Sequence, residues 1–376
     1  MKKMKIYIIA GEPSGDLHAS NLMRSILDKH TNVDFRFWGG DRMKSIQKNG
    51  LVKHISELSF MGFIEVILNL NKILRNFKFC KDDIRCYNPD AIILIDYPGF
   101  NLRIAKWAKL MGIKVYYYIS PQVWAWKKNR VYQIKKNVDC MFVILPFEKD
   151  FFESFDFQVQ YFGHPLLDEI SKFNSSNNHN FFMNSNNLGD LPIIAVLPGS
   201  RRQEISLLLP EMLKGLEVFR SHQIIVAGVS NLSLDFYKSI DPDINVVFNK
   251  TYDLLSNASI AVVTSGTATL ETALFKVPQI VCYKSSLISY YIAKMLIKVN
   301  FISLVNLIMH KEVVKELIQK DCNSYTIQKE ARKIIHDLHY QNEIKNNYQE
   351  LEKKLGEVGA SEKVAQFLLK DLLINS

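Results

Sequence analysis

Cysteine is scarce in this sequence, and its spacing fits neither a disulfide framework nor a zinc site. The chain of 376 residues has five cysteines, an odd number, with no Cys-x-x-Cys pair among them. We therefore expect reduced thiols and a cytoplasmic location. Long apolar runs are also missing, because none approaches the roughly eighteen residues that a membrane-spanning helix needs. The apolar run 6–10 that follows the basic start is too short for a signal peptide, so none is expected.

Nucleic-acid motifs are absent as well, although the chain is basic. Lys and Arg number 47 against 38 Asp and Glu, which gives a formal net charge of +9. Such a balance suits nucleic acid, an anionic membrane or an acidic substrate. The sequence contains no basic helix with interleaved aromatic residues, so we expect no nucleic-acid partner.

The sequence does contain a regular alternation of β-branched runs and helical stretches. This alternation predicts an α/β fold with two Rossmann-like parallel-sheet domains that face a central cleft. Hydrophobic residues make up 48% of the chain, which is enough for two cores. The predicted strands are 4–10, 34–38, 91–95, 114–119 and 140–144 in the first half, and 193–197, 223–228, 245–248, 259–263 and 279–283 in the second.

The domain boundary is expected in the segment 173–190, whose richness in Asn and Ser marks a linker or an exposed irregular stretch. The first domain then takes residues 1–170 and the second takes 171–345. The remaining residues, 346–376, are predicted as helices that pack back on the first domain or on a partner chain. The sequence leaves the choice between a monomer and a homodimer open.

Two loops of the second half have the layout of an anion-binding site. Each follows a β-branched strand and opens a helix, so its backbone N–H groups and the helix dipole attract a phosphate. Arg201 adds a cation that can bind in a bidentate manner. Glu271, one turn into the second helix, is placed to accept hydrogen bonds from a sugar diol. The residues predicted to bind a nucleotide diphosphate are Gly199, Ser200, Arg201, Ser265, Gly266, Thr267 and Glu271.

Another polar loop follows the first strand of the first half. The stretch 11–16 lacks the full Gly-x-Gly-x-x-Gly pattern and is not a Walker loop. It is therefore either a loop that holds a phosphate or a sugar, or a tight turn. Its candidate ligand-binding residues are Gly11, Glu12, Ser14 and Asp16.

Two residues of the first half are candidate general bases. Asp96 directly follows the apolar strand 91–95, where partial desolvation raises the pKa of a carboxylate toward a useful value. The alternative is that Asp96 caps the helix after Pro98. His164, in Phe-Gly-His-Pro, is a second candidate, and its alternative is a hydrogen-bonded structural histidine.

The stretch 61–83 predicts an amphipathic helix with an unusually broad apolar face. Basic residues beside that face suit a helix that lies on an anionic membrane surface, while the alternative is a helix packed on the core. The expected membrane contacts are Phe63, Ile67, Leu70 and Leu74. The apolar stretch 287–309 is a second candidate for reaching the membrane surface.

Two further features of the sequence are less diagnostic of function. Trp124 and Trp126 either stack on sugar rings or a membrane interface, or pack at the sheet edge. Asp241-Pro242-Asp243 has the Asp-x-Asp spacing of metal-dependent glycosyltransferases, but it precedes its strand beside a proline. We therefore expect a turn there and no metal.

Taken together, the motifs of this chain resemble those of the lipid-A-disaccharide synthase family, glycosyltransferases of the GT-B fold. The resemblance runs nearly end to end and rests on the joint, ordered occurrence of several motifs. They are 10–16 (AGEPSGD), 61–66 (MGFIEV), 95–101 (IDYPGFN), 118–126 (YISPQVWAW), 145–148 (LPFE), 162–165 (FGHP), 197–201 (LPGSR), 265–271 (SGTATLE) and 303–307 (SLVNL).

The resemblance implies an inverting, metal-independent reaction without a cofactor. UDP-2,3-diacylglucosamine would donate its sugar to the 6-hydroxyl of 2,3-diacylglucosamine 1-phosphate at the cytoplasmic face of the inner membrane, in lipid A assembly. By the same resemblance Asp96 is the catalytic base, Arg201 handles the donor diphosphate, Glu271 binds the ribose, and Asn306 lies near the nucleotide. Gly99 and Val305 depart from the family pattern, which has Asp and Pro there. Gly99 strengthens the assignment of Asp96.

Two alternatives to this activity stay open from the residues alone. One is another GT-B enzyme, such as a UDP-N-acetylglucosamine epimerase or the peptidoglycan N-acetylglucosaminyltransferase. The other is a membrane-bound nucleotide-binding module without catalysis.

Overall fold

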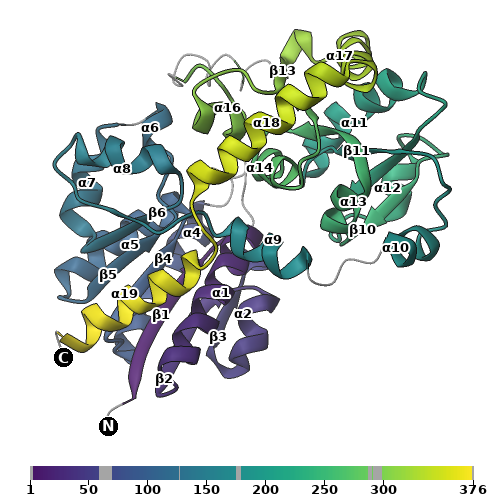
Figure 1. Cartoon of the computed structure of the whole chain (residues 1–376). Coiled ribbons are helices and arrows are strands. Elements are labelled where there is room, and N and C mark those ends of the chain that lie inside the picture. The colour runs from purple at the N-terminus through teal and green to yellow at the C-terminus, as the bar shows by residue number, and fades with distance from the viewer. Residues whose placement is uncertain are drawn as a thin grey trace. The chain divides into compact units, whose positions relative to one another are not determined.

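The chain forms two compact units, each built on a parallel β-sheet (Figure 1). The structure is a computed structural model that describes residues 3–58, 70–126, 128–174, 179–286, 290 and 299–374. The first unit comprises residues 1–168 and 356–376, and the second comprises residues 169–355. The helical segment expected at 346–376 is divided between them, because α18 (Leu338–Leu355) belongs to the second unit and α19 (Ala360–Ile374) to the first.

The sheet of the first unit has seven strands among the described residues, in the order β3-β2-β1-β4-β5-β6-β7. All neighbouring pairs are parallel. The five strands expected from the sequence are present, and the short edge strands β3 and β7 were not predicted. The bounds are β1 Met4–Ala10, β2 Val33–Gly39, β3 Leu51–His54, β4 Ala91–Ile95, β5 Lys114–Tyr118, β6 Cys140–Val143 and β7 Gln160–Tyr161.

Helices cover both faces of this sheet, because alternate residues of its central strands are apolar on both sides. One face packs against α1 (Pro13–Lys29), α2 (Asp41–Ile46) and α19, which lies along α1 in Figure 1. The other face packs against helices whose apolar residues include Phe77, Ile104 and Ile134. These helices are α4 (Leu70–Tyr87), α5 (Pro98–Leu110), α7 (Arg130–Asn137) and α8 (Pro146–Glu153), with the short α6 (Val123–Trp126) nearby in sequence.

The sheet of the second unit has six strands among the described residues, in the order β10-β9-β8-β11-β12-β13, again all parallel. Five of them match the expected strands, and β13 was not predicted. The bounds are β8 Ile193–Leu197, β9 Gln223–Gly228, β10 Val246–Phe248, β11 Ala258–Thr264, β12 Gln279–Tyr283 and β13 Lys315–Ile318.

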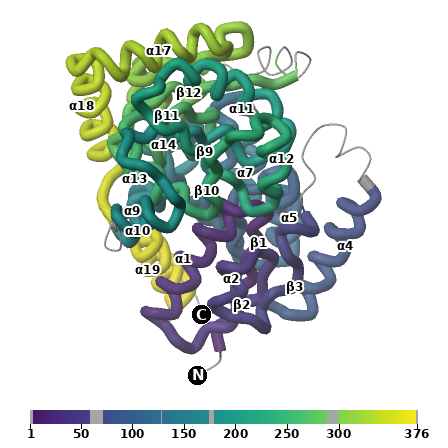
Figure 2. Tube along the Cα trace, turned by 90° about the vertical axis from the view of Figure 1, so that its right-hand side faces the viewer, coloured from purple at the N-terminus to yellow at the C-terminus, as the bar shows by residue number. Residues whose placement is uncertain are grey.

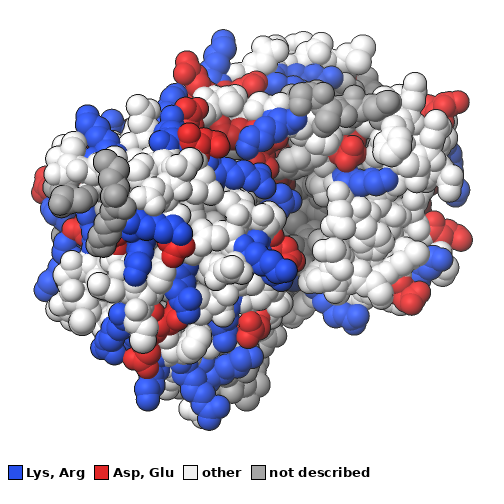
Figure 3. Space-filling model, turned by 90° about the horizontal axis from the view of Figure 1, so that it is seen from below, with Lys and Arg blue, Asp and Glu red and all other residues white. Residues whose placement is uncertain are grey.

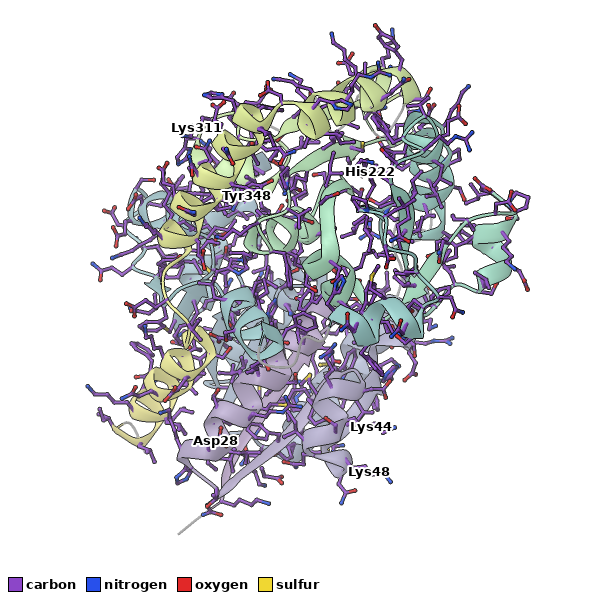
Figure 4. The ribbon with its side chains drawn as sticks, turned by 45° about the vertical axis from the view of Figure 1, so that its right-hand side comes forward. Asp28, Lys44, Lys48, His222, Lys311 and Tyr348 are labelled. Atoms are coloured by element: carbon purple, nitrogen blue, oxygen red, sulfur yellow. The ribbon has the colours of Figure 1, made fainter. Side chains whose placement is uncertain are left out.

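Helices also enclose the second sheet. Long α17 (Ser324–His336) packs along α11 (Arg202–Leu216), as Figure 2 shows. Tyr348 of α18, labelled in Figure 4, is fully buried and its hydroxyl accepts a hydrogen bond from Gln279 Nε2. The other helices are α9 (Leu166–Asn174), α10 (His179–Ser185), α12 (Leu234–Lys238), α13 (Thr251–Asn257), α14 (Thr267–Leu274) and α16 (Leu304–Met309). The irregular segment expected at 173–190 therefore contains a short helix, α10, anchored by the buried ring of Phe182.

Candidate functional site

Four of the predicted site segments follow the strands at which the strand order of each sheet reverses. In the first sheet β1 and β4 are neighbours although they are not consecutive, and β8 and β11 are the equivalent pair in the second. Open parallel sheets bind ligands beyond the carboxyl ends of such strand pairs. The loop 11–16 and Asp96 follow β1 and β4, while the loops 199–201 and 265–267 follow β8 and β11. The sequence could not reveal this pairing, because strand order is a long-range property.

Asp96 lies on a strained elbow between β4 and α5. Its φ is +43° and that of Tyr97 is +47°, a left-handed conformation that costs free energy for residues other than glycine. The elbow is held by its own carbonyl groups. The Asp96 carbonyl accepts hydrogen bonds from Tyr117 Oη at 2.5 Å and from Asn101 Nδ2 at 2.8 Å. Asn101 is fully buried, and its amide also reaches the carbonyl groups of Ile9 and Ile95.

The environment of the Asp96 carboxyl group raises its pKa to about 7. Burial is the main cause, since it penalises the charged form, and the nearby negative charge of Glu12 adds to it. A hydrogen bond from the Tyr97 backbone acts in the opposite direction. The side chain remains partly accessible. A carboxylate with this pKa can take up a proton near neutral pH, which is what a general base requires.

A buried glutamate, Glu148, supports this end of the sheet and was missed as a site-supporting residue. It accepts hydrogen bonds from Ser120 Oγ at 2.5 Å and Trp124 Nε1 at 3.1 Å. The backbone N–H groups of Ile144 and Leu145 also donate to it, so it caps the start of α8. The signal was present in the sequence, as a glutamate two residues after the proline that opens a helix. Its charge contributes to the raised pKa of Asp96.

The hydrogen bond to Glu148 favours packing at the sheet edge for Trp124, one of the two interpretations offered for the tryptophans. Trp124 is only 9% exposed and packs edge-on against Phe147, so it belongs to the fold. Trp126 remains 41% exposed, with the guanidinium of Arg130 at 5.3 Å from its ring centre.

The loop 11–16 combines structural and accessible residues. Gly11 is packed so closely that a Cβ atom would lie 2.4 Å from the Tyr97 ring, so it is needed for the elbow itself. Asp16 is 4% exposed and accepts N–H groups of Gly40, Arg42 and Met43, which makes it a cap for α2 rather than a group that faces a ligand. Glu12 and Ser14, by contrast, are partly or fully exposed.

His164 lies in the interior of the first unit. It is 2% exposed, and its Nδ1 accepts the backbone N–H of Leu166 at 3.2 Å. Burial lowers the pKa of His164 to about 3, and the neighbouring buried His18 contributes. A histidine that stays neutral and bonded inside the fold fits the structural alternative better than a base.

In the second unit, the loop after β8 carries an exposed arginine at the start of α11. Arg201 is the N-cap residue of the helix and is exposed, whereas the guanidinium of Arg202 lies 4.5 Å from the ring centre of Phe236. The Ser200 N–H, one of the groups predicted to attract a phosphate, already has a hydrogen-bond partner within the protein. It donates to Glu204 Oε2 at 3.2 Å, and Glu204 Oε1 accepts from Thr264 Oγ1 at 3.1 Å.

The loop after β11 leaves its helix start accessible. Gly266 is the N-cap of α14, has φ +155° and is exposed, as is Thr267. Apart from residues next to it in the chain, no described residue has a heavy atom within 4 Å of the position of a Gly266 Cβ atom. Their N–H groups have no acceptor within the helix, which makes them donors for an anion. Ser265 instead serves the fold, because its hydroxyl donates to the Ile302 carbonyl at 2.8 Å.

Glu271 is held by a residue that the sequence analysis did not single out. Tyr252 on α13 donates its hydroxyl hydrogen bond to Glu271 Oε1 at 2.9 Å. Burial raises the pKa of Glu271, and the bond from Tyr252 lowers it. The position of the Glu271 carboxylate is therefore set by a second helix, and no local sequence signal links the two residues.

Asn306 has a structural environment. It is 0% exposed, its Oδ1 accepts the N–H groups of Val313 and Val314, and its Nδ2 donates to the Val314 carbonyl and to Glu316. Its amide is thus satisfied within the protein. Through these bonds it holds α16 to β13 and the residues before that strand.

The predicted membrane-contacting helix is described only from α4 onward. Phe63 and Ile67 lie outside the described residues, as does the side chain of Leu70, and so do 287–289 and 291–298 of the second apolar stretch. Leu74 is 54% exposed and Phe79 is 47% exposed. Ile73 and Phe77 of the same helix pack on the core of the first unit, and the Arg36–Asp83 ion pair holds α4 further along.

Charged groups of both signs are spread over the face of the molecule that Figure 3 shows. Figure 3 shows Lys and Arg side chains distributed over the visible face with acidic side chains between them. Among the described residues, no group of His, Cys, Asp or Glu is arranged to hold a metal ion. Within the same part of the chain, every helix is too short or too polar to span a membrane.

Comparison with known proteins identifies the family. A family model for lipid-A-disaccharide synthetase matches residues 6–370. The lipid-A-disaccharide synthase of Syntrophus aciditrophicus is 38% identical over 378 residues, covering 98% of each chain, and that of Coxiella burnetii is 35% identical over 374 residues, also covering 98% of each.

Solved structures agree at the level of the fold. The UDP-GlcNAc 2-epimerase of Neisseria meningitidis, solved with UDP-GlcNAc, has a TM-score of 0.67 at 14% identity and covers 98% of this chain and 100% of its own. A glycosyltransferase of Rickettsia africae has a TM-score of 0.58 at 14% identity over the full length of both chains. Similarity at this identity shows the GT-B fold alone. Because the matches above 30% identity and the family model span nearly the whole sequence, the chain belongs to the lipid-A-disaccharide synthase family.

Proposed function

We propose that in this chain Asp96 is the base of the disaccharide-forming reaction and that the loops 199–201 and 265–267 hold the donor diphosphate. The donor is UDP-2,3-diacylglucosamine and the acceptor is 2,3-diacylglucosamine 1-phosphate. The observation that carries the proposal is the Asp96 carboxyl group, which has a pKa of about 7 on a strained and heavily hydrogen-bonded elbow. Such strain persists at functional sites because the surrounding structure supports it.

In the proposed step, the 6-hydroxyl oxygen of the acceptor attacks the anomeric carbon of the donor. The hydroxyl proton passes to Asp96, and the bond between the anomeric carbon and the diphosphate breaks, so that UDP leaves. Attack from the face opposite to the leaving group inverts the anomeric centre and gives a β-1,6 linkage. The developing charge on UDP is met by the N–H groups of Gly266 and Thr267 and by Arg201.

The donor ribose is assigned to Glu271. A carboxylate can accept hydrogen bonds from two neighbouring hydroxyl groups, and Tyr252 fixes its orientation. The alternative of an epimerase is not favoured, since the relatives that match above 30% identity are disaccharide synthases while the epimerases share only the fold.

The test is an assay of UDP release with acylated donor and acceptor, run beside a donor that lacks acyl chains. The variant Asp96→Asn should lose about 10²–10⁴-fold in kcat, the range expected for loss of a general base. Its dissociation constant for UDP should be unchanged. The matched control is Asp82→Asn, an exposed aspartate of the same unit paired only locally with Arg85, and it should keep full activity. Turnover by Asp96→Asn near the wild-type rate would refute the assignment of the base.

We also propose that the chain associates peripherally with the cytoplasmic face of the inner membrane through the exposed side of α4. Leu74 and Phe79 are exposed there, beside the exposed basic residues Lys72, Arg75 and Lys78. Apolar side chains flanked by cations suit an anionic lipid surface. Because acylated sugars reside in the bilayer, an enzyme that uses them gains access to its substrates there.

Sedimentation with vesicles that contain anionic lipid tests this surface. The double variant Leu74→Ser with Phe79→Ser should reduce the bound fraction several-fold while the protein stays folded. Because Phe79 also packs beside Trp38, the single variant Leu74→Ser, which lacks this change, should show part of the loss at unchanged thermal stability. Leu110, which is 79% exposed at the end of α5, provides the control Leu110→Ser. Equal binding of the double variant and the wild type would exclude this side of α4 as the contact.

A further inference from the structure

A carboxylate of the protein occupies the donor-site loop after β8. Glu204 Oε2 accepts the Ser200 N–H at 3.2 Å, and Glu204 Oε1 accepts the hydroxyl hydrogen bond of Thr264 at 3.1 Å. Thr264 is the last residue of β11, directly before the second anion-binding loop. One side chain therefore links the loop after β8 to the last residue of the neighbouring strand β11, from which the second loop starts.

The first loop is shaped around this carboxylate. A Cβ atom on Gly199 would lie 2.1 Å from Glu204 Oε2 and 2.5 Å from the carboxyl carbon. Gly199 also has φ +119°, a conformation that side chains other than glycine rarely adopt. Both the missing side chain and the backbone conformation of Gly199 are thus required for the carboxylate to reach the Ser200 N–H.

Glu204 is in the first turn of α11, where a negative charge is favoured by the helix dipole. This is also where a phosphate of the donor would be favoured, and for the same reason. A carboxylate and a phosphate cannot both take the Ser200 N–H at full strength. Two anions that approach one helix start also repel each other.

We infer that Glu204 is a positioning residue that stands in for the donor phosphate: it keeps both loops in their anion-receiving conformation, and its charge limits the affinity of the site for UDP. The inference rests on the proposed donor site. Weaker binding of UDP favours release of this product at the end of each catalytic cycle. A residue that served only as a helix cap would instead act through its hydrogen bonds, which an uncharged amide largely reproduces.

The variants Glu204→Gln and Glu204→Asp separate the effect of the charge of this side chain from the effect of its length. Glutamine keeps the length and an acceptor oxygen but removes the charge, so the dissociation constant for UDP, measured by calorimetry, should fall about tenfold. Product inhibition by UDP should strengthen to the same extent. Aspartate keeps the charge but is one methylene shorter, so it cannot link the loops, and the KM for the donor should rise severalfold without tighter UDP binding.

The matched control is Glu217→Gln, which removes the same charge from the exposed C-cap of the same helix. That position is about 20 Å along the helix from Glu204, at about 1.5 Å per residue. At this distance salt screens the interaction, so UDP binding should be unchanged.

The outcomes distinguish this inference from the proposed function. If the wild type binds UDP and forms product, but Glu204→Gln binds UDP no more tightly than the wild type, the role of Glu204 as a competing charge is wrong and the donor site stands. If the Gln variant fails to fold, Glu204→Asp still decides, since UDP binding tighter than in the wild type would contradict the inference. If the wild type neither binds UDP nor releases it from acylated donor, the proposed function fails and the inference fails with it.

Discussion

Replacement of Asp96 by Asn should stabilise the folded protein above neutral pH, although it slows turnover by orders of magnitude. The Asp96 carboxyl group has a pKa of about 7 in the folded protein, against an ordinary value of 3.8. Between these two values the folded state holds a proton that the unfolded state has released. The unfolding free energy therefore falls as the pH rises from about 4 through 7. Above pH 7 the loss is complete.

The magnitude follows from the two pKa values. A difference between 3.8 and about 7 corresponds to about 4 kcal/mol, since one pKa unit is worth about 1.4 kcal/mol. Asparagine has no charge to desolvate, and it tolerates the left-handed conformation that this position requires. The variant loses part of the bond from the Tyr97 backbone, so the net gain at pH 8 should be about 2–4 kcal/mol.

Denaturant unfolding of the wild type and Asp96→Asn at pH 4 and at pH 8 measures this gain. The two proteins should be equally stable at pH 4, and the variant should be more stable at pH 8. Asp82→Asn serves again as the control, because Asp82 is exposed and its replacement should change stability little at either pH. The reasoning that burial destabilises the charged form of Asp96 would be refuted by a variant less stable than the wild type at pH 8. A difference in unfolding free energy that does not depend on pH would refute it as well.

Three further predictions concern residues that support the two sites. Asn101→Ala removes the amide that holds the carbonyl groups of the elbow, so the unfolding free energy should fall by about 1–3 kcal/mol. The kcat should also drop while UDP binding is retained. An unchanged kcat would show that the elbow keeps its shape without Asn101. Tyr252→Phe should raise the donor KM severalfold and leave the acceptor KM unchanged, because Glu271 loses the hydroxyl that orients it; equal effects on both would contradict this. Burial lowers the pKa of His18 to about 4 and that of His164 to about 3, so the unfolded state binds their protons first, and this contribution should lower the unfolding free energy by about 3 kcal/mol or more as the pH drops from 6.5 toward 4. Denaturant titrations of Asp96→Asn across that range would show it, because this variant lacks the opposing contribution of Asp96. A flat profile of that variant would argue against two neutral buried histidines.

Much of the fold was predictable because its signals are local. β-branched runs such as 91–95 and 193–197 are strands in the structure with those bounds. Short or edge elements were missed, among them β13 and the helix α10 within the Asn-rich segment, because two to seven polar or mixed residues carry little periodicity. Their conformation depends on what packs against them.

The candidate sites were predictable to a different degree. Asp96 and the helix starts at Arg201 and Gly266 were identifiable from residue type and from the position after a strand. Asp16 and Asn306 are equally polar in sequence, yet their side chains form hydrogen bonds to backbone groups inside the fold. Polarity alone does not tell a ligand-binding group from a group that satisfies buried backbone.

The sequence by itself determined the family, the alternation of strands and helices, and the chemical types at the site, because motifs and periodicity are written in neighbouring residues. Tertiary structure alone decided the strand order that brings β1 beside β4 and β8 beside β11. It also decided which side chains from distant segments form hydrogen bonds, including Tyr252 with Glu271 and Thr264 with Glu204. The physical reason is that burial and hydrogen bonding between distant segments exist only in the folded chain, and these set the pKa of Asp96 and the occupancy of the donor loop.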